Sequence, residues 1–426
     1  MLRDRTRTAL GAAAALALVT SAASAPVPKN LPRGVSEVLY EIVVPPGAEP
    51  TPEKVALGEK LFNDKRISVN DKVSCATCHD PDKGFVDHKP LAEGVAAPAK
   101  RTQRNSPTVL NAMFNAVQFW DGRAPSLEEQ AKLPILNPIE MGQKSSDDVV
   151  NKLRGIAEYR TAFQQVFGHE LTYDDVAGAI AAFERTQYAG DAPFDRFVAG
   201  DEKAIDDSAR RGWGLFNGKG RCNNCHAFST VSPLFSDQKF HNIGIAAHKT
   251  DFIGLARKAT AIVRGGDLKQ IDELAIQTDL SELGRFLVTK SSNDIGAFKT
   301  PGLRNIAITS PYMHDGSFAT LWDVMDHYNK GGVPNPNLDG GMQRLGLTEA
   351  EIDDMVSFMG SLTSAKFAAF GKQEMARQQA KKTVRPERDT AVATGKKGDL
   401  GDLAPTPDAA KPAAFGVLVR KGTSYD

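Results

Sequence analysis

The chain has 426 residues, and its 52 lysines and arginines balance 52 aspartates and glutamates, so the formal net charge is zero. This balance, together with the lack of a basic stripe interleaved with aromatic residues, argues against nucleic-acid binding and against bulk attraction to a membrane surface. The length allows two domains of ordinary size.

The first 25 residues are typical of a secretory signal peptide. A basic start is followed by an apolar stretch from Ala9 to Val19 and by a small-residue cleavage site at Ala23-Ser24-Ala25. The apolar stretch is short and alanine-rich for a membrane span, although an uncleaved N-terminal anchor stays open as an alternative. We therefore expect an exported protein, periplasmic in a bacterium. Residues 26–48 are Pro-rich and are predicted to be a linker that leads into the first domain.

All four cysteines lie in two Cys-x-x-Cys-His motifs, Cys75-Ala-Thr-Cys78-His79 and Cys222-Asn-Asn-Cys225-His226. This motif is the attachment site of c-type haem, in which both thiols form thioethers to the porphyrin and the histidine ligates the iron. Structural zinc and short-range disulfides are the alternatives. Closed zinc sites take four ligands rather than six, so the pattern favours two covalent haems.

An internal repeat surrounds the two motifs. Gly58-x-x-Leu61-Phe62-Asn63 precedes the first motif, and Gly212-x-x-Leu215-Phe216-Asn217 precedes the second. After the motifs, five residues recur at a constant offset of 194: Pro107, Asn111, Asp121, Gly122 and Leu127 match Pro301, Asn305, Asp315, Gly316 and Leu321. Each copy ends with a Thr-x-x-acid helix start, at Thr172 and Thr348, followed by apolar residues at helical spacing.

The repeat predicts a mostly α-helical chain of two tandem cytochrome c domains, residues 49–205 and 206–366, each with its own covalent haem. The offset between the copies rises from 147 at the haem motifs to 194 downstream, so the second copy carries about 47 extra residues, near 247–293. Residues 251–278 of this insert are predicted to be largely helical, without an assigned role. Residues 367–426 are predicted to be a disordered tail, because much of this stretch has few large apolar residues.

The repeat also indicates what lies on the far side of each iron. The offset of 194 aligns Pro134 of the first copy with Tyr328 of the second. Proline has no side-chain donor, whereas a phenolate can ligate ferric haem, so one iron is expected to be open and the other capped. Met313 and Met325 compete with Tyr328 for the capping role.

Taken together, the motifs resemble the bacterial dihaem cytochrome c peroxidases and their MauG-type relatives. The resemblance covers residues 50–365 apart from the insert, and it rests on the two haem motifs and on four segments: 104–111 (RNSPTVLN), 119–123 (FWDGR), 136–142 (LNPIEMG) and 311–316 (PYMHDG). It implies that Trp120 lies between the haems and that Gln130 and Glu140 line a peroxide pocket at the first haem. The plainer readings are a core tryptophan, a glutamine on a helix surface and a carboxylate in a turn.

Three positions depart from the pattern of the classical peroxidases or of MauG. Val95 stands where classical members carry a histidine that closes the peroxide site at rest, with His88 left as a substitute, and Tyr328 stands where they carry methionine. Both changes match the MauG-type branch. Gly220, however, replaces the tryptophan through which the best-known MauG-type enzyme oxidises its protein substrate, so the same substrate is in doubt.

The resemblance further implies a calcium ion held between the domains by Asn105, Thr309 and Pro311, a donor set of oxygens that suits calcium; otherwise Asn105 only caps a turn. The expected function is a periplasmic enzyme that reacts with hydrogen peroxide and draws electrons from a small cytochrome c or cupredoxin. MauG-type oxidation of a partner protein is the alternative, and a dihaem electron carrier that is not an enzyme is the third possibility. The remaining histidines His241, His248 and His314 are expected to be structural.

Overall fold

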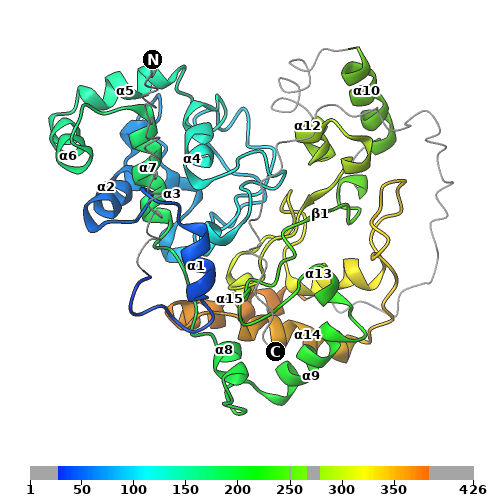
Figure 1. Ribbon diagram of the computed structural model, residues 1–426. Helices are drawn as coiled ribbons and strands as arrows, with labels where there is room; N and C mark the ends of the chain where they lie inside the picture. The colour runs from blue at the N-terminus through cyan, green and yellow to red at the C-terminus, as the bar shows by residue number, and fades with distance from the viewer. Residues whose placement is uncertain (1–26, 249–250, 266–278, 383–426) are drawn as a thin grey trace, which may run out of the picture.

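The protein is described by a computed structural model that covers residues 27–248, 251–265 and 279–382 (Figure 1). The described chain is mostly helical, as expected, with one two-stranded antiparallel ribbon. The helices are α1 (Glu37–Val43), α2 (Pro52–Asn63), α3 (Cys75–Cys78), α4 (Leu127–Leu136), α5 (Ser146–Arg154), α6 (Ala157–Phe167), α7 (Tyr173–Glu184), α8 (Pro193–Val198), α9 (Asp207–Asn217), α10 (Phe252–Arg264), α12 (Phe286–Thr289), α13 (Leu321–Asn329), α14 (Glu349–Ser361) and α15 (Ala368–Ala380), and the strands are β1 (Phe240–His241) and β2 (Phe298–Lys299).

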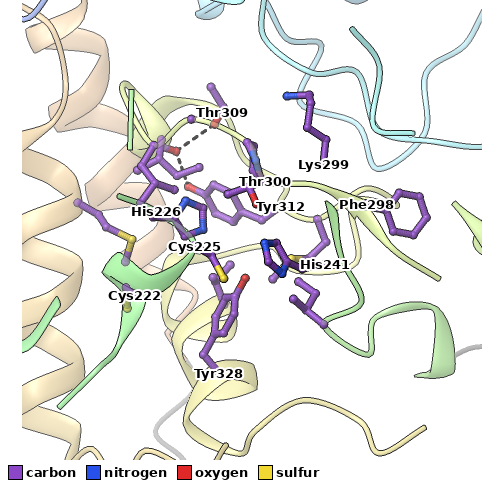
Figure 2. A pocket seen from close by; sticks show the side chains of 18 of the residues that line it. Cys222, Cys225, His226, His241, Phe298, Lys299, Thr300, Thr309, Tyr312 and Tyr328 are labelled. Carbon is purple, nitrogen blue, oxygen red and sulfur yellow. Dashed lines mark hydrogen bonds between the residues drawn. The ribbon is translucent and has the colours of Figure 1, made fainter. Parts of the chain in front are cut away.

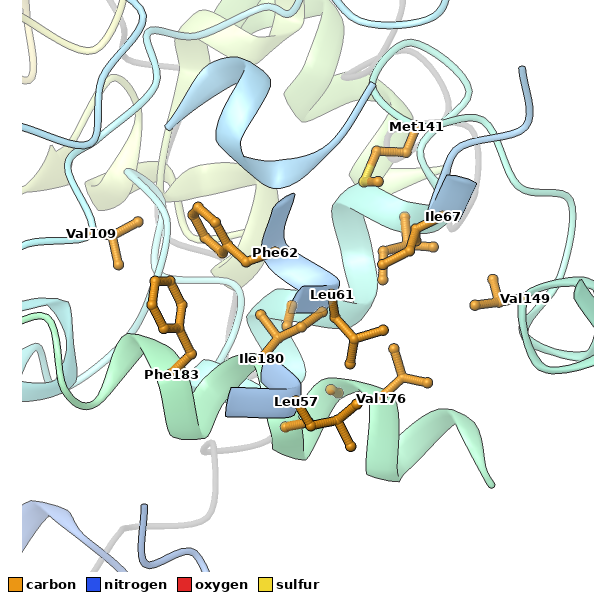
Figure 3. Packing of buried hydrophobic residues seen from close by; sticks show 14 of the residues in the cluster. Leu57, Leu61, Phe62, Ile67, Val109, Met141, Val149, Val176, Ile180 and Phe183 are labelled. Atoms are coloured by element: carbon orange, nitrogen blue, oxygen red, sulfur yellow. The ribbon is translucent and has the colours of Figure 1, made fainter. Parts of the chain in front are cut away.

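The first domain is organised by the crossing of α2 and α7. Gly58 of α2 lies so close to α7 that a Cβ at this position would be 1.9 Å from the carbonyl oxygen of Ala179. Around this contact, Leu57, Leu61 and Phe62 from α2 pack against the apolar residues of α7 (Figure 3). The capping box predicted at Thr172 starts α7, and its apolar spacing places Val176, Ile180 and Phe183 in the core.

The second domain repeats this crossing with α9 and α14. A Cβ on Gly212 would be 2.0 Å from the carbonyl oxygen of Asp354, so glycine is required here for the same steric reason. The predicted capping box at Thr348 starts α14, which buries Ile352, Met355 and Met359. The glycine of each Gly-x-x-Leu-Phe-Asn motif is therefore the point where the first and last helices of its domain touch.

The loops that connect each haem motif to the next long helix, α4 in the first domain and α13 in the second, have matching backbone features at equivalent residues. Asn111 and Asn305 both adopt left-handed backbone conformations, with φ of 61° and 62°. The isolated bridge between Gln118 and Ala124 recurs between Tyr312 and Phe318. After these bridges, α4 and α13 begin at residues 127 and 321, so the offset of 194 holds in three dimensions.

The segment before the first domain is not a loose linker. α1 lies within residues 26–48, and it buries Tyr40, which is 1% exposed, and Val44 in a cluster with Ala181 of α7 and Leu234 of the second domain. The expected linker is wrong for this part of the chain, because the prediction weighed its prolines and overlooked these apolar residues.

The expectation of a disordered tail is also wrong for residues 367–382, where α15 packs across both domains. Gln378 of α15 is fully buried, donates a hydrogen bond to the carbonyl oxygen of Ala307 and accepts one from the backbone N–H of Leu321. Phe370 contacts the first hydrophobic core and Met375 the second. Much of this contact is polar, so hydrophobic patterning could not reveal it. Residues 383–426 and the predicted signal peptide lie outside the described residues.

The start of the second domain and the structure of the insert differ in part from the expectations. Phe194 and Phe197 of α8 pack in the second core, so this packing unit begins before the expected residue 206. Within the insert, α10 confirms part of the predicted helical stretch, and residues 266–278 are not described. No helix within the described ranges combines the length and the hydropathy that a bilayer crossing needs.

The glycine at each helix crossing generates a stability prediction. Gly58→Ala forces α2 away from α7 and should lower the free energy of unfolding by about 1–3 kcal/mol, the usual cost of overpacking. Gly178→Ala is the matched control, because this α7 glycine has open space around its Cβ position, and alanine there should add about 0.5–1 kcal/mol of helix stability. Denaturant titration measures both changes, and equal effects of the two variants would contradict the proposed contact.

Candidate active site

The first haem motif forms a single helical turn. Cys75 and Cys78 lie in α3, and the backbone N–H of Ser74 donates to the hydroxyl of Thr77, which fixes the start of the turn. Nδ1 of His79 lies 3.2 Å from the carbonyl oxygen of Phe85. Because a carbonyl oxygen only accepts, Nδ1 carries the proton and Nε2 is left to bind a metal.

The second motif has the same arrangement. Cys222 begins a short 3₁₀ turn, and Nδ1 of His226 lies 2.9 Å from the carbonyl oxygen of Phe235. Burial lowers the pKa of His79 and of His226, so both imidazoles stay neutral, which is the form that ligates iron. The four cysteines form no disulfide with one another.

Each motif opens into its own cavity, and these cavities fit a tethered haem. The first-haem cavity has a volume of about 780 Å³ and is lined by Cys75, Cys78 and His79. The second-haem cavity is lined by Cys222, Cys225 and His226 (Figure 2). The exposed lining of both cavities is mostly apolar, as expected for a buried cofactor, and polar side chains are interspersed in it.

The structure brings three of the predicted site residues together in the first-haem cavity. Gln130 and Pro134 reach it from α4, and Glu140 reaches it from the turn that follows α4. The backbone around Glu140 is fixed, because its N–H donates to the carbonyl oxygen of Asn137 and its own carbonyl accepts from Val95. Burial raises the pKa of Glu140 above its ordinary value, and the charge of Arg123 only partly opposes this.

Val95 occupies the position of the classical closing histidine, and it is held by this same backbone hydrogen bond of 2.8 Å to Glu140. Gly94 allows the close approach, since a Cβ there would be 2.4 Å from the Glu140 carbonyl oxygen. His88 lies elsewhere: its Nδ1 is 2.8 Å from the carbonyl oxygen of Ser310, and its ring packs against Phe370 of α15. The structure therefore does not place His88 on the lining of the first-haem cavity.

Trp120 lines both cavities. Its Nε1 donates a 2.9 Å hydrogen bond to the carbonyl oxygen of Asn105, and its own carbonyl oxygen accepts from the backbone N–H of Lys299 in β2. The indole is thus held by Asn105 of the first domain, and the backbone of Trp120 is bound by the second domain.

Tyr328 lies on α13 at the place that corresponds to Pro134 on α4, and Figure 2 shows its hydroxyl pointing into the cavity that His226 lines. Met313 and Met325 also line this cavity. Burial raises the pKa of the Tyr328 phenol, so its ionisation would need a strong local positive charge such as that of ferric iron.

The remaining histidines are engaged with other protein groups. His241 lies between two carboxylates, with Nδ1 2.7 Å from Asp339 and Nε2 2.9 Å from Asp237. His314 is buried, with Nε2 2.8 Å from Glu282, and its ring stacks on Phe298. His248 lies 3.5 Å from His327, between ring nitrogens.

The residues expected to hold calcium share one region. Asn105, Thr309 and Pro311 all line the second-haem cavity. The side-chain nitrogen of Asn105 donates to the carbonyl oxygens of Lys89 and Pro90, at 2.9 and 3.3 Å, so a cation would be bound through the side-chain oxygen.

Comparison with known proteins decides the family. The sequence model of the di-haem cytochrome c peroxidases matches residues 52–203. The methylamine utilization protein MauG of Methylorubrum extorquens is 40% identical over 325 residues, which cover 76% of this chain and 82% of that protein. The chain belongs to the di-haem cytochrome c peroxidase/MauG family.

Other similar proteins include both a cytochrome c peroxidase and a MauG-like protein. The cytochrome c551 peroxidase of Pseudomonas aeruginosa is 36% identical to this di-haem peroxidase, with 72% of this chain and 78% of that protein covered. A solved MauG-like protein associated with microbial copper homeostasis superposes with a TM-score of 0.62 at 29% identity, covering 79% of this chain and 95% of that one. The protein is accordingly a peroxidase-type enzyme with two c-type haems.

Sequence reasoning missed a buried carboxyl group of the first-haem cavity. Glu184, the last residue of α7, is 6% exposed and lines the cavity, and its Oε2 has no hydrogen-bond partner. Burial raises the pKa of Glu184 from its ordinary 4.5 to about 8, although the cation of Arg185 works in the opposite direction. The signal in the sequence is a carboxylate directly after the apolar run of α7, where the repeat has Gly360 at the end of α14.

Glu184 makes the stability of the di-haem peroxidase depend on pH. The folded protein keeps this proton up to about pH 8, whereas the unfolded chain loses it above about pH 4.5, so wild-type stability falls as the pH rises through that window. Glu184→Gln removes the effect and should raise the free energy of unfolding by about 1–4 kcal/mol at pH 8, with little gain at pH 4.5.

Denaturant titrations of the holoprotein at both pH values measure this difference. Glu158→Gln provides a control of opposite sign, because Lys60 and Arg66 lower the pKa of this exposed carboxylate, and its loss should slightly reduce stability at pH 8. A pH-independent effect of Glu184→Gln would show that the buried carboxyl does not titrate as described.

Proposed function

We propose that this enzyme reduces hydrogen peroxide at the first haem and draws the electrons through the second haem from a small cytochrome c or cupredoxin. Bound haem would supply the redox-active iron at which peroxide reacts. The observation that carries the proposal is the difference between two equivalent helices: α4 presents Pro134 to its cavity, and α13 presents Tyr328. Pro134 provides no ligand, so the first-haem cavity keeps room for a small oxidant on the side of α4.

The polar side chains in the part of the first-haem cavity next to α4 suit peroxide chemistry. Glu140 can take the proton from one peroxide oxygen and give it to the other, so that the second oxygen leaves as water. Burial raises the pKa of this carboxyl above its ordinary value, which makes it a stronger proton acceptor. Gln130 offers an amide that can orient peroxide by hydrogen bonding.

Electron transfer between the two sites would use Trp120. Trp120 lines both cavities; its indole donates a hydrogen bond to Asn105 of the first domain, and its backbone carbonyl accepts one from Lys299 of the second. A non-enzymatic electron carrier is a weaker interpretation, because it would need a protein ligand at each iron, and Pro134 and Val95 supply none at the first.

A second candidate is MauG-type oxidation of side chains on a partner protein. Val95 and Tyr328 favour it, since both match that branch of the family, and the 40% identity to MauG of Methylorubrum extorquens is consistent with it. Gly220 lies on the lining of the second-haem cavity and carries no side chain that could pass charge outward. We therefore favour a small redox protein as the partner.

Two further parts of the proposal concern the setting of the enzyme. Residues 1–25 would direct export to the periplasm, where c-type haem is attached. A calcium ion would be bound by the side-chain oxygen of Asn105 and the backbone carbonyls of Thr309 and Pro311, all of which are hard oxygen donors.

Replacement of Glu140 tests the proton transfer. Glu140→Gln should retain both haems and the spectrum of the reduced protein, yet slow peroxide turnover by about 10²- to 10⁴-fold, the usual contribution of a positioned acid–base group. The assay follows peroxide-driven oxidation of a reduced cytochrome c. Glu129→Gln is the control, because this exposed carboxylate on α4 pairs with Lys132 and does not line the cavity. Unchanged turnover in Glu140→Gln would reduce this carboxyl to a structural role.

Replacement of Tyr328 tests the difference between the two haems. Tyr328→Phe should open or re-ligate the second haem alone, so the visible and electron paramagnetic resonance spectra of the low-spin haem change while the high-spin haem binds cyanide as before. Tyr312→Phe is the control: this tyrosine lines the same cavity, but its hydroxyl is 3.1 Å from the carbonyl oxygen of Ile306. If Tyr328→Phe leaves both haem spectra unaltered, another residue caps the second iron.

A further inference from the structure

The insert of the second domain forms part of the first-haem cavity. Residues 281–290, here called the insert wall, have no counterpart in the first copy of the repeat. Four of them nevertheless line the first-haem cavity: Ser281, Leu287, Val288 and Lys290. The second-haem cavity has no lining residue from this segment. The wall therefore distinguishes the two haem sites, as Pro134 and Tyr328 do.

Arg285 fastens the insert wall to the first domain. Its Nη1 donates to the carbonyl oxygens of Asp121 and Gly122, each at 3.0 Å, and its guanidinium lies 4.3 Å from the ring centre of Phe240. Gly122 has a φ of 68°, and a Cβ there would be 2.9 Å from Nη1 of Arg285. The turn that follows Trp120 is therefore shaped to receive this guanidinium.

Two more contacts hold the start of the wall. Nη2 of Arg104 donates a 2.9 Å hydrogen bond to the carbonyl oxygen of Ser281, while Nη1 of the same residue pairs with Asp121 at 2.6 Å. Glu282 is 2.8 Å from His314 in a buried pair. The wall is thus tied to Asp121 both directly through Arg285 and indirectly through Arg104.

The outer edge of the wall is apolar. Val288 is 38% exposed and Leu133 of α4 is 42% exposed, yet both line the first-haem cavity, so they lie where it meets solvent. Leu287 lies deeper and is 8% exposed. Val288, Leu133 and Leu287 offer an incoming molecule neither charge nor a hydrogen bond, so this part of the opening can discriminate by size. Lys290 of the wall also lines the cavity, and its ammonium donates a hydrogen bond to the carbonyl oxygen of Leu287.

We propose that the insert wall sets the size of the ligand or oxidant that reaches the first haem. Val288 and Leu287 are the specificity-determining residues, and Arg285 is the positioning residue that holds them against the first domain. Hydrogen peroxide passes, and hydroperoxides with a bulky apolar substituent are excluded. The statement about oxidants rests on the proposed peroxidase function, whereas the statement about ligand size does not.

Binding of ligands of graded size to the ferric holoprotein tests the proposal without turnover. Cyanide, imidazole and 4-phenylimidazole are titrated against the high-spin haem of the wild type and of the Val288→Ala, Leu287→Ala and Arg285→Gln variants. Cyanide affinity should stay within about twofold, and 4-phenylimidazole affinity should rise by about tenfold or more in each variant. Val231→Ala is the matched control, because it truncates an exposed valine, 57% exposed, that does not line the cavity. Arg285→Lys, which keeps the charge but loses the planar guanidinium, should give an intermediate affinity.

The proposal is overturned if the wild type binds 4-phenylimidazole as tightly as imidazole, or if both leucine and valine truncations leave the size dependence unchanged. These truncations decide the matter even if Arg285→Gln fails to fold. A parallel assay with hydrogen peroxide and tert-butyl hydroperoxide separates this inference from the enzyme's function. If hydrogen peroxide is turned over normally and neither ligand affinity nor turnover depends on molecular size, only the proposal about the wall is refuted. If ligand affinity depends on size but the enzyme reacts with neither peroxide, only the proposed peroxidase function is refuted.

Discussion

Both halves of the molecule depend on the close crossing of a first and a last helix at a single glycine. At Gly58 and at Gly212 a Cβ would lie 1.9 and 2.0 Å from a carbonyl oxygen of the facing helix, so the backbones of the two helices are in direct contact. The haem motif comes after the first helix of each pair in the chain, and the apolar face of the last helix contributes to the core of that domain. The crossing therefore fixes the attachment point of each haem relative to the distal helix, α4 or α13, that covers its other side.

Because the two domains share the same backbone arrangement, the two haem sites differ mainly in a few side chains. α4 and α13 start from the same kind of cap, after the same bridge and left-handed turn, and they differ where Pro134 and Tyr328 point inward. α7 and α14 differ in a similar way, with Glu184 at the end of one and Gly360 near the end of the other. Reactivity toward small molecules can thus be assigned to one domain without altering the backbone of either.

The repeat made most of this arrangement predictable from sequence. The capping boxes act over a few residues and are confirmed as the starts of α7 and α14, and the offset of 194 is confirmed in the paired bridges and in the starts of α4 and α13. The contacts of α15 and the insert wall were not predictable, because they join segments far apart in the chain largely through buried amides and backbone carbonyls. The contacts of α1 are apolar, but their partners also lie far away in the sequence. Gln378 illustrates the difficulty: it is fully buried, yet its residue type favours the surface. Glu184 was missed because a lone carboxylate at a helix end usually faces water.

The contacts that sequence could not reveal make the two domains one functional unit. Trp120 belongs to the first domain, but its carbonyl is bound by Lys299, and the turn after it receives Arg285 from the insert. Asp121 in that turn pairs with Arg104, which in turn holds Ser281 of the insert wall. A displacement of the insert would therefore change the position of the tryptophan between the haems as well as the opening of the first-haem cavity. Under the proposed function, access of the oxidant and the route for electrons would share one set of hydrogen bonds, so a change in one would affect the other.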